Sequence, residues 1–187
     1  MIIKLFNNKI FVPNKCGTRY LQKYYNFKEF EHRFLPNIKN ETYFIIREPI
    51  EQLKSALHTE LLNYRNTNNF DKRFMNFLSQ NGTVHYSNSL YKSIFLYKQK
   101  NKECKIININ ELNELIKKLG NIPEYDKKNY DFSNEVENWI DKNKFYEYLK
   151  NMWPNEISIL ENWSYIENEY YKKLLSNNIE KLSINII

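Results

Sequence analysis

The sequence predicts an α/β fold with three layers, in which a small, mostly parallel central sheet is flanked by helices. Three short apolar runs have the length and composition of buried strands, and each is followed by a segment whose apolar residues recur at helical spacing. The resulting order of alternating strands and helices is typical of parallel strands joined by crossover helices. No repeat, low-complexity segment or linker interrupts the 187 residues. We therefore expect one domain over residues 1–187.

The first third of the chain contains one clear strand. It is predicted at 10–13, where the run Ile-Phe-Val ends at Pro13. A helix is predicted at 17–25, because its tyrosines and leucine fall on one helical face. An edge strand is expected at 30–35, just before the turn-forming pair that begins at Pro36.

The second clear strand is predicted at 43–46, and helices follow it. Its run Tyr-Phe-Ile-Ile is aromatic and β-branched without interruption, which is typical of a strand buried on both faces. Pro49 stands where the first turn of a helix tolerates proline, and apolar residues at helical spacing extend that helix to residue 61. Further helices are predicted at 71–78 and 90–97.

The third clear strand is predicted at 104–109. A helix begins at 110 and ends near Gly120, since glycine is favoured just beyond a helix end. Two more helices are predicted, over about 134–150 and 156–176. Ligands of such sheets bind beyond the carboxyl ends of the strands, so the polar residues after the first two strands are the candidates for a site.

Charge and cysteine content narrow the classes of function. The chain has 28 basic and 22 acidic residues, a formal net charge of +6, without a basic tail. We interpret this charge as a solvated surface and expect no nucleic-acid partner. Two cysteines without a CxxC spacing predict neither a disulfide framework nor a zinc site. No apolar run has the length of a membrane span and no signal peptide is recognised, so we expect a reduced, cytoplasmic protein whose oligomeric state stays open.

The first polar cluster is Asn-Lys-Cys-Gly-Thr at 14–18, between the first strand and the next helix. The free backbone N–H groups and the dipole at a helix start attract anions. Gly17 allows a ligand to approach the backbone closely, Lys15 adds a cation and Thr18 a hydroxyl, so together they suit a phosphate or sulfate.

The first cluster has other interpretations. An ordinary turn with Thr18 as the helix N-cap explains the same residues. The stretch lacks the GxxxxGK[ST] pattern of P-loop nucleotide triphosphatases. A cysteine phosphatase is excluded as well, because its arginine, six residues after Cys16, is replaced by Gln22.

The second polar cluster follows the second strand. Arg47 stands at the strand's carboxyl end, and Ser55 lies two helical turns further along the chain. The planar fork of an arginine suits a phosphate, and a serine hydroxyl adds one hydrogen bond. Alternatively, Arg47 pairs at the surface with Glu48 or Glu51 and Ser55 is a neutral helix residue.

In this order, the two clusters resemble the sulfotransferases that use 3′-phosphoadenosine 5′-phosphosulfate (PAPS), especially the carbohydrate sulfotransferase group. In that family a P-K-x-G-T loop cradles the 5′-phosphosulfate. A later R-x-P strand end, with a serine eight residues after the arginine, holds the 3′-phosphate. The matching residues here are Lys15, Gly17, Thr18, Arg47, Pro49 and Ser55. Asn14 separates Pro13 from Lys15, where the family has Pro-Lys directly.

The resemblance implies a P-loop-like sulfotransferase architecture, PAPS as donor with adenosine 3′,5′-bisphosphate (PAP) as product, and no metal. More faintly, residues 105–115 and 166–175 resemble the family's later strand with its helix start and its closing tyrosine-rich helix. The resemblance also implies that Lys15 stabilises the negative charge that grows on the oxygen between phosphorus and sulfur. The implied cofactor-binding residues are Lys15, Cys16, Gly17, Thr18, Arg19, Arg47 and Ser55.

An acceptor hydroxyl also needs a base. The resemblance places a base histidine in a loop comparable to that of His85, so we expect His85 to take the proton. His58 stays open for this role, as does a carboxylate such as Glu48 or Glu60, and His32 is interpreted as structural.

The resemblance thus implies a PAPS-dependent sulfotransferase that acts on a hydroxyl or amine of an acceptor, expected to be a carbohydrate. One alternative is a degenerate sulfotransferase or kinase-like P-loop protein that binds nucleotide. The other is a basic nucleic-acid-binding module with interleaved tyrosines and phenylalanines. That module requires a continuous face of aromatic and lysine residues, whereas the aromatic residues here recur at the spacing of a helical core.

Overall fold

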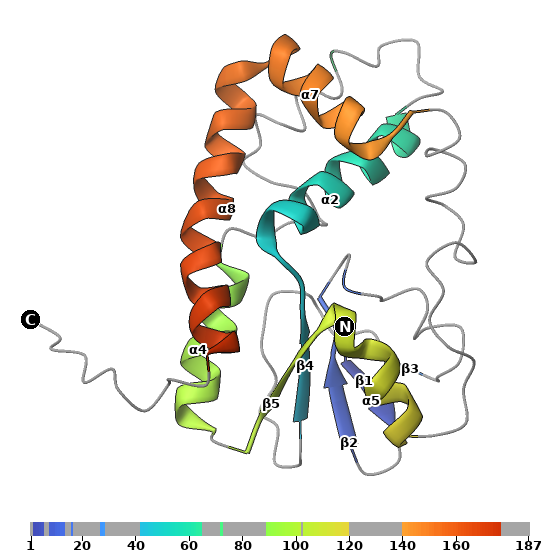
Figure 1. Ribbon diagram of the computed structural model, residues 1–187, viewed down its shortest axis with the longest axis vertical. Coiled ribbons are helices and arrows are strands. Elements are labelled where there is room, and N and C mark those ends of the chain that lie inside the picture. The colour runs from blue at the N-terminus through green and yellow to red at the C-terminus, as the bar shows by residue number, and fades with distance from the viewer. Residues whose placement is uncertain are drawn as a thin grey trace, which may run out of the picture.

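The chain folds into an α/β structure, a small sheet with helices packed around it (Figure 1). The computed structural model describes residues 2–5, 8–13, 16, 27–28, 42–64, 72, 89–101, 103–119 and 140–176. In order, its elements are β1 (Ile2–Leu5), β2 (Asn8–Phe11), β3 (Phe27–Lys28), β4 (Thr42–Ile46), α2 (Pro49–Tyr64), α4 (Leu90–Lys100), β5 (Lys105–Asn108), the 3-10 turn η1 (Ile109–Glu111), α5 (Leu112–Leu119), α7 (Lys142–Met152) and α8 (Pro154–Leu175). Within these residues, no helix is both long and apolar enough to cross a membrane.

The described strands form one mixed sheet in the order β3-β1-β2-β4-β5. β2, β4 and β5 are parallel neighbours, which confirms the mostly parallel arrangement of the three clear strands. β1 pairs antiparallel with β2 and β3. The carboxyl ends of β2, β4 and β5 therefore lie along one edge of the sheet.

The sequence analysis missed β1 and β3. In β1, Ile2 pairs with Phe11 and Leu5 with Asn8, so only two residues separate β1 from β2. The signal for this hairpin is the apolar run on either side of the Asn-Asn pair. The first predicted strand is also shifted: β2 begins at Asn8 and ends before Pro13, which has no N–H for a strand ladder.

β4, the parallel neighbour of β2, agrees most closely with its predicted range. β4 adds only Thr42 to the predicted range, and Phe44, Ile45 and Ile46 are completely buried. Because successive side chains point to opposite faces, this burial shows that both faces of the strand are covered. β5 is shorter than predicted, since the chain turns into η1 at Ile109.

The predicted helices that fall on described residues are present, with shifted ends, and the helix predicted from 134 begins only at Lys142. α2 begins at Pro49 as expected and ends at Tyr64. α7 begins at Lys142, where the Asp141 carboxylate caps it by accepting hydrogen bonds from two backbone N–H groups. α8 begins at Pro154, a residue suited to a first helical turn.

The remaining predicted elements fall outside the part of the chain that the structure describes. These are the helix at 17–25, the edge strand at 30–35 and, apart from Lys72, the helix at 71–78.

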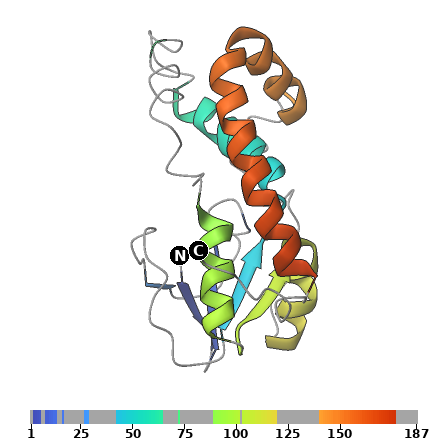
Figure 2. The same ribbon diagram turned by 90° about the vertical axis from the view of Figure 1, so that its left-hand side faces the viewer.

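Two clusters of buried side chains form the core, and α8 contributes to both of them. Figure 2 shows α8 running from the α7 end of the molecule down to the level of the sheet. Its first half packs on α2 and α7 through Ile157 and Leu160. Its last turn packs through Leu174 on the cluster that α4 forms with β2 and β4. Tyr171, near the C-terminal end of α8, is thereby placed close to the carboxyl ends of β4 and β5.

Candidate functional site

The ends of β2 and β4 bring residues of the two polar clusters together. The Cys16 N–H donates a hydrogen bond to the Pro13 carbonyl, 3.2 Å away, in the segment after β2. Arg47 directly follows β4, the parallel neighbour of β2. The positive charge of Arg47 and a hydrogen bond with the Tyr91 hydroxyl both act on the Cys16 thiol. Cys16 of the first cluster and Arg47 of the second therefore share Tyr91 as a partner, because the Cys16 thiol and the Arg47 backbone both hydrogen-bond with its hydroxyl.

The Cys16 thiol is not suited to chemistry. The side chain is fully buried, and this burial raises its pKa to about 12, although Arg47 and Tyr91 act in the opposite direction. A thiol with such a pKa is protonated at neutral pH and is a poor nucleophile. The Cys16 N–H is bonded to the Pro13 carbonyl, so these contacts of Cys16 lie within the protein.

Tyr91, which the sequence analysis did not single out, fixes the backbone of Arg47. The Arg47 N–H donates to the Tyr91 hydroxyl oxygen over 3.2 Å, and that hydroxyl also contacts the Arg47 carbonyl. The Gln52 Oε1 atom lies 2.8 Å from the same hydroxyl. Because a hydroxyl has one proton, it donates to either the Arg47 carbonyl or Gln52 Oε1 at a time. Tyr91 is 1% exposed, so these bonds are shielded from water.

Glu167 in turn holds the start of α4. Ser89 precedes α4 without a capping side-chain bond, and Glu167 Oε2 instead accepts a hydrogen bond from the Tyr91 N–H. Burial raises the pKa of Glu167 above its ordinary value, although the backbone N–H groups of Tyr91 and Lys92 act to lower it. α8 therefore helps to position α4, and through Tyr91 it also positions Arg47.

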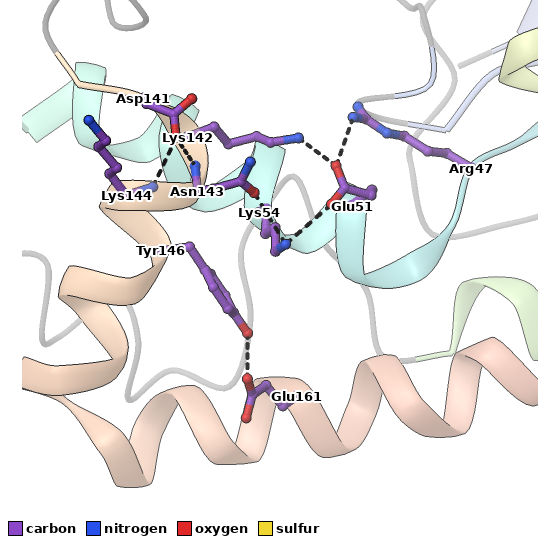
Figure 3. A network of polar contacts seen from close by, with 9 residues as sticks. All are labelled: Arg47, Glu51, Lys54, Asp141, Lys142, Asn143, Lys144, Tyr146 and Glu161. Carbon is purple, nitrogen blue, oxygen red and sulfur yellow. Dashed lines mark hydrogen bonds and ion pairs between the residues drawn. The ribbon is translucent and has the colours of Figure 1, made fainter.

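Basic side chains surround the Glu51 carboxylate (Figure 3). Lys142 Nζ lies 2.5 Å from Glu51 Oε2, Lys54 Nζ 3.3 Å from Oε1, and Arg47 Nη2 3.8 Å from Oε2. Burial alone would raise the pKa of Glu51, but the hydrogen bonds and charges of Lys142 and Lys54 outweigh it and lower the pKa. Of the two acidic partners considered for Arg47, the structure pairs it with Glu51.

A cavity of about 450 Å³ opens at the carboxyl ends of β4 and β5. It is lined by Arg47, Glu48, Glu51, Asn108, Ile109, Asn110, Asn113 and Tyr171. The Asn108 side-chain amide donates to the Tyr171 hydroxyl over 2.7 Å, which ties the end of β5 to α8. Burial raises the pKa of Tyr171, and the Glu48 carboxylate acts in the same direction. The asparagines of this wall were not predicted, although they recur just after the third strand.

Ser55, His58 and Glu60 lie further along α2. Ser55 is half-buried and is not among the residues that line the cavity. The His58 ring is 5% exposed, and its Nε2 atom lies 3.0 Å from the Ile140 carbonyl, to which it donates as the N–H tautomer. Glu60 is also 5% exposed. Neither His58 nor Glu60 is accessible enough to take a proton from an acceptor.

The other predicted site residues lie outside the part of the chain that the structure describes. They are Lys15, Gly17, Thr18, Arg19 and His85.

A second cavity, of about 240 Å³, lies between the start of α2 and the middle of α8. It is lined by Glu48, Ile50, Glu161, Ser164, Tyr165 and Asn168. Sequence reasoning missed it, although the polar residues Glu161, Ser164 and Asn168 recur at helical spacing within the predicted helix.

Comparisons with family models, with curated proteins and with solved structures find no match for this chain. Its function is therefore inferred from the site itself.

Proposed function

We propose that the protein is a PAPS-dependent sulfotransferase. The observation that carries the proposal is that Cys16, within the predicted phosphosulfate loop, and Arg47, the predicted ligand of the 3′-phosphate, hydrogen-bond with the same Tyr91 hydroxyl. Both residues follow parallel neighbouring strands, at the edge where ligands of α/β sheets bind. The large cavity at that edge has Arg47 in its wall.

The charges around Arg47 are compatible with a bound phosphate. The Arg47–Glu51 contact, at 3.8 Å, is the longest of the three that Glu51 makes with basic groups. Glu51 keeps Lys142 and Lys54 as partners when the Arg47 guanidinium turns toward a phosphate. Arg47 is thus able to offer its fork to a doubly charged group without leaving Glu51 unpaired.

The proposed reaction transfers a sulfuryl group in line. The acceptor oxygen forms a bond to sulfur while the bond between sulfur and the 5′-phosphate oxygen breaks, and PAP leaves. Lys15 stabilises the negative charge that grows on this bridging oxygen, and the N–H groups of Gly17 and Thr18 hold the phosphate, while the Cys16 N–H keeps its bond to the Pro13 carbonyl. His85 takes the proton of the acceptor hydroxyl.

Binding of PAP tests the proposal. Wild-type protein should gain thermal stability from PAP, by about 2.7 kcal/mol when the ligand is at a hundred times its dissociation constant. Adenosine 5′-monophosphate, which lacks the 3′-phosphate, should bind more weakly in isothermal titration calorimetry. Absence of any stabilisation at millimolar PAP would remove the cofactor assignment.

The variant Arg47→Ala tests the phosphate contact. It should weaken PAP binding by about tenfold or more, because a charge-assisted hydrogen bond is lost, and should no longer favour PAP over the monophosphate. Lys172→Ala removes the same charge from an exposed position on α8, where Lys172 pairs with Glu169 at 3.6 Å, and is the matched control. Equal affinities in the two variants would exclude Arg47 from the site. PAP binding without transfer to any acceptor would favour the nucleotide-binding alternative.

A further inference from the structure

Glu48 lies at the boundary of the two cavities, because it is the residue that lines both of them. Its side chain is exposed, and it makes no hydrogen bond or ion pair with the described residues. Its neighbour Arg47 pairs with Glu51 instead. An acidic group that borders both the proposed donor cavity and a second cavity is well placed to contact a molecule in each.

The second cavity also contains other polar atoms with unused hydrogen-bonding capacity. Tyr146 and Lys150 both donate to Oε1 of Glu161, at 2.8 and 2.9 Å, so its Oε2 keeps its lone pairs. The Asn168 side chain has no hydrogen-bond partner among the described residues. Carboxylate oxygens accept hydrogen bonds, and an amide both donates and accepts them. These groups complement a ligand that carries several hydroxyls.

The aromatic wall of the cavity points to the same class of ligand. Tyr165 is 70% exposed, so one large ring stands open to solvent beside these polar groups. An exposed tyrosine presents an apolar face at low conformational cost, as the C–H face of a sugar ring requires. A phenol would instead need an enclosed slot, whereas this cavity is open to solvent and combines an apolar wall with the polar groups of Glu48, Glu161 and Asn168.

We propose that the second cavity binds the acceptor, a hydroxyl-rich sugar, with Glu48 directing the reacting hydroxyl toward the donor cavity. Tyr165 stacks on the sugar ring, and Asn168 and Glu161 bind its other hydroxyls. The inference rests on the proposed sulfotransferase function for the reaction, but binding of the sugar does not require the donor.

Saturation-transfer NMR without nucleotide tests the site. The probes are the methyl glycosides of glucose, galactose and N-acetylglucosamine, with p-nitrophenol as a phenol. At least one glycoside should bind with a millimolar dissociation constant. Tyr165→Ala and Asn168→Ala should each weaken it by about fivefold, the loss expected for one contact of about 1 kcal/mol. Tyr148→Ala and Asn162→Ala change exposed residues of α7 and α8 outside the cavity, and should leave the affinity unchanged.

Three results would overturn this inference. The first is the absence of a saturation-transfer NMR signal for every glycoside at tens of millimolar. The second is an equal glycoside affinity in the cavity variants and the control variants. The third is binding of p-nitrophenol alone, in a way that depends on Tyr165. A separate PAP titration keeps the two proposals distinct. If the protein binds a glycoside but not PAP, the sugar site stands and the proposed sulfotransferase reaction fails. If it binds PAP but no glycoside, only the proposed sugar site fails.

Discussion

The thiol of Cys16 and the backbone N–H of Arg47 hydrogen-bond with the same Tyr91 hydroxyl, although the two residues follow different strands, and the positive charge of Arg47 acts on the thiol. A nearby cation usually makes a cysteine more reactive, because it stabilises the thiolate. Here burial is the larger effect and raises the pKa of Cys16 to about 12. Tyr91 therefore joins the segments that follow the two strands, and the charge of Arg47 does not make Cys16 a nucleophile.

We predict that Cys16→Ser retains PAP binding and sulfuryl transfer. A serine hydroxyl is close to the size of the thiol and has the Tyr91 hydroxyl as a hydrogen-bond partner. Turnover of PAPS by the variant, compared with wild type at equal folded fraction, checks this. Complete loss of transfer in a folded variant that still binds PAP would assign chemistry to the thiol.

Tyr91→Phe should destabilise the protein by about 1–3 kcal/mol, because the substitution leaves buried polar groups without their partner. The groups affected are the Gln52 amide and the backbone of Arg47. Urea denaturation gives the free energy of unfolding. Tyr148→Phe, at an exposed position of α7, is the control and should change it little. Equal stabilities of the two variants would show that the Tyr91 hydroxyl does not anchor Arg47.

Tyr91 also illustrates what the sequence could and could not predict. Local sequence patterns were sufficient to predict β4 and the start of α2. The continuous apolar run that ends at Ile46 indicates the strand, and Pro49 indicates the first turn of the helix. The partners of Tyr91 come from distant segments, through the end of β4 and through Glu167 of α8. Helical spacing marks Tyr91 as a core residue, but no spacing rule reveals which backbone groups its hydroxyl will meet.

The same limit applies to the candidate site. Arg47 was found because it stands at a strand end, where a general rule places ligands. Its pairing with Glu51 rather than Glu48 depends on where α2 begins. Lys142 approaches Glu51 only because α7 packs against α2 through a shared core. The second cavity depends likewise on the packing of α8 on α2, which local sequence does not determine.

Glu167→Gln should change how stability depends on pH. Burial raises the pKa of Glu167 in the folded protein above its ordinary value of 4.5, so the folded state binds this proton more tightly than the unfolded chain. The contribution of Glu167 is then most favourable below the ordinary pKa and decreases as the pH rises through the folded pKa. The free energy of unfolding of wild type minus that of Glu167→Gln should fall from acidic to neutral pH. A difference that rises instead would show that Glu167 is held as a carboxylate.

Glu51→Gln should show the opposite trend with pH. The folded pKa of Glu51 is lowered below 4.5 by the net effect of its basic partners, so its contribution is present above the unfolded pKa and is lost as the pH falls through the folded pKa. The variant should also bind PAP more tightly at neutral pH, because the carboxylate competing for Arg47 is gone. Calorimetric titration measures this, with Glu169→Gln on α8 as the charge-matched control. Weaker binding in Glu51→Gln alone would mean that Glu51 positions Arg47 for the phosphate.

The last prediction concerns the group that takes the proton. If His85 is the base, His85→Ala should slow transfer by about 10²–10⁴-fold and leave PAP binding unchanged, because the base acts only on the acceptor. Glu48→Gln keeps a hydrogen-bonding side chain at the cavity boundary, so it should mainly raise the KM for a sugar acceptor. His32→Ala is the control for loss of a histidine. Measuring kcat and KM for all three with labelled PAPS separates the roles, and a folded Glu48→Gln that loses turnover while His85→Ala keeps it would make Glu48 the base.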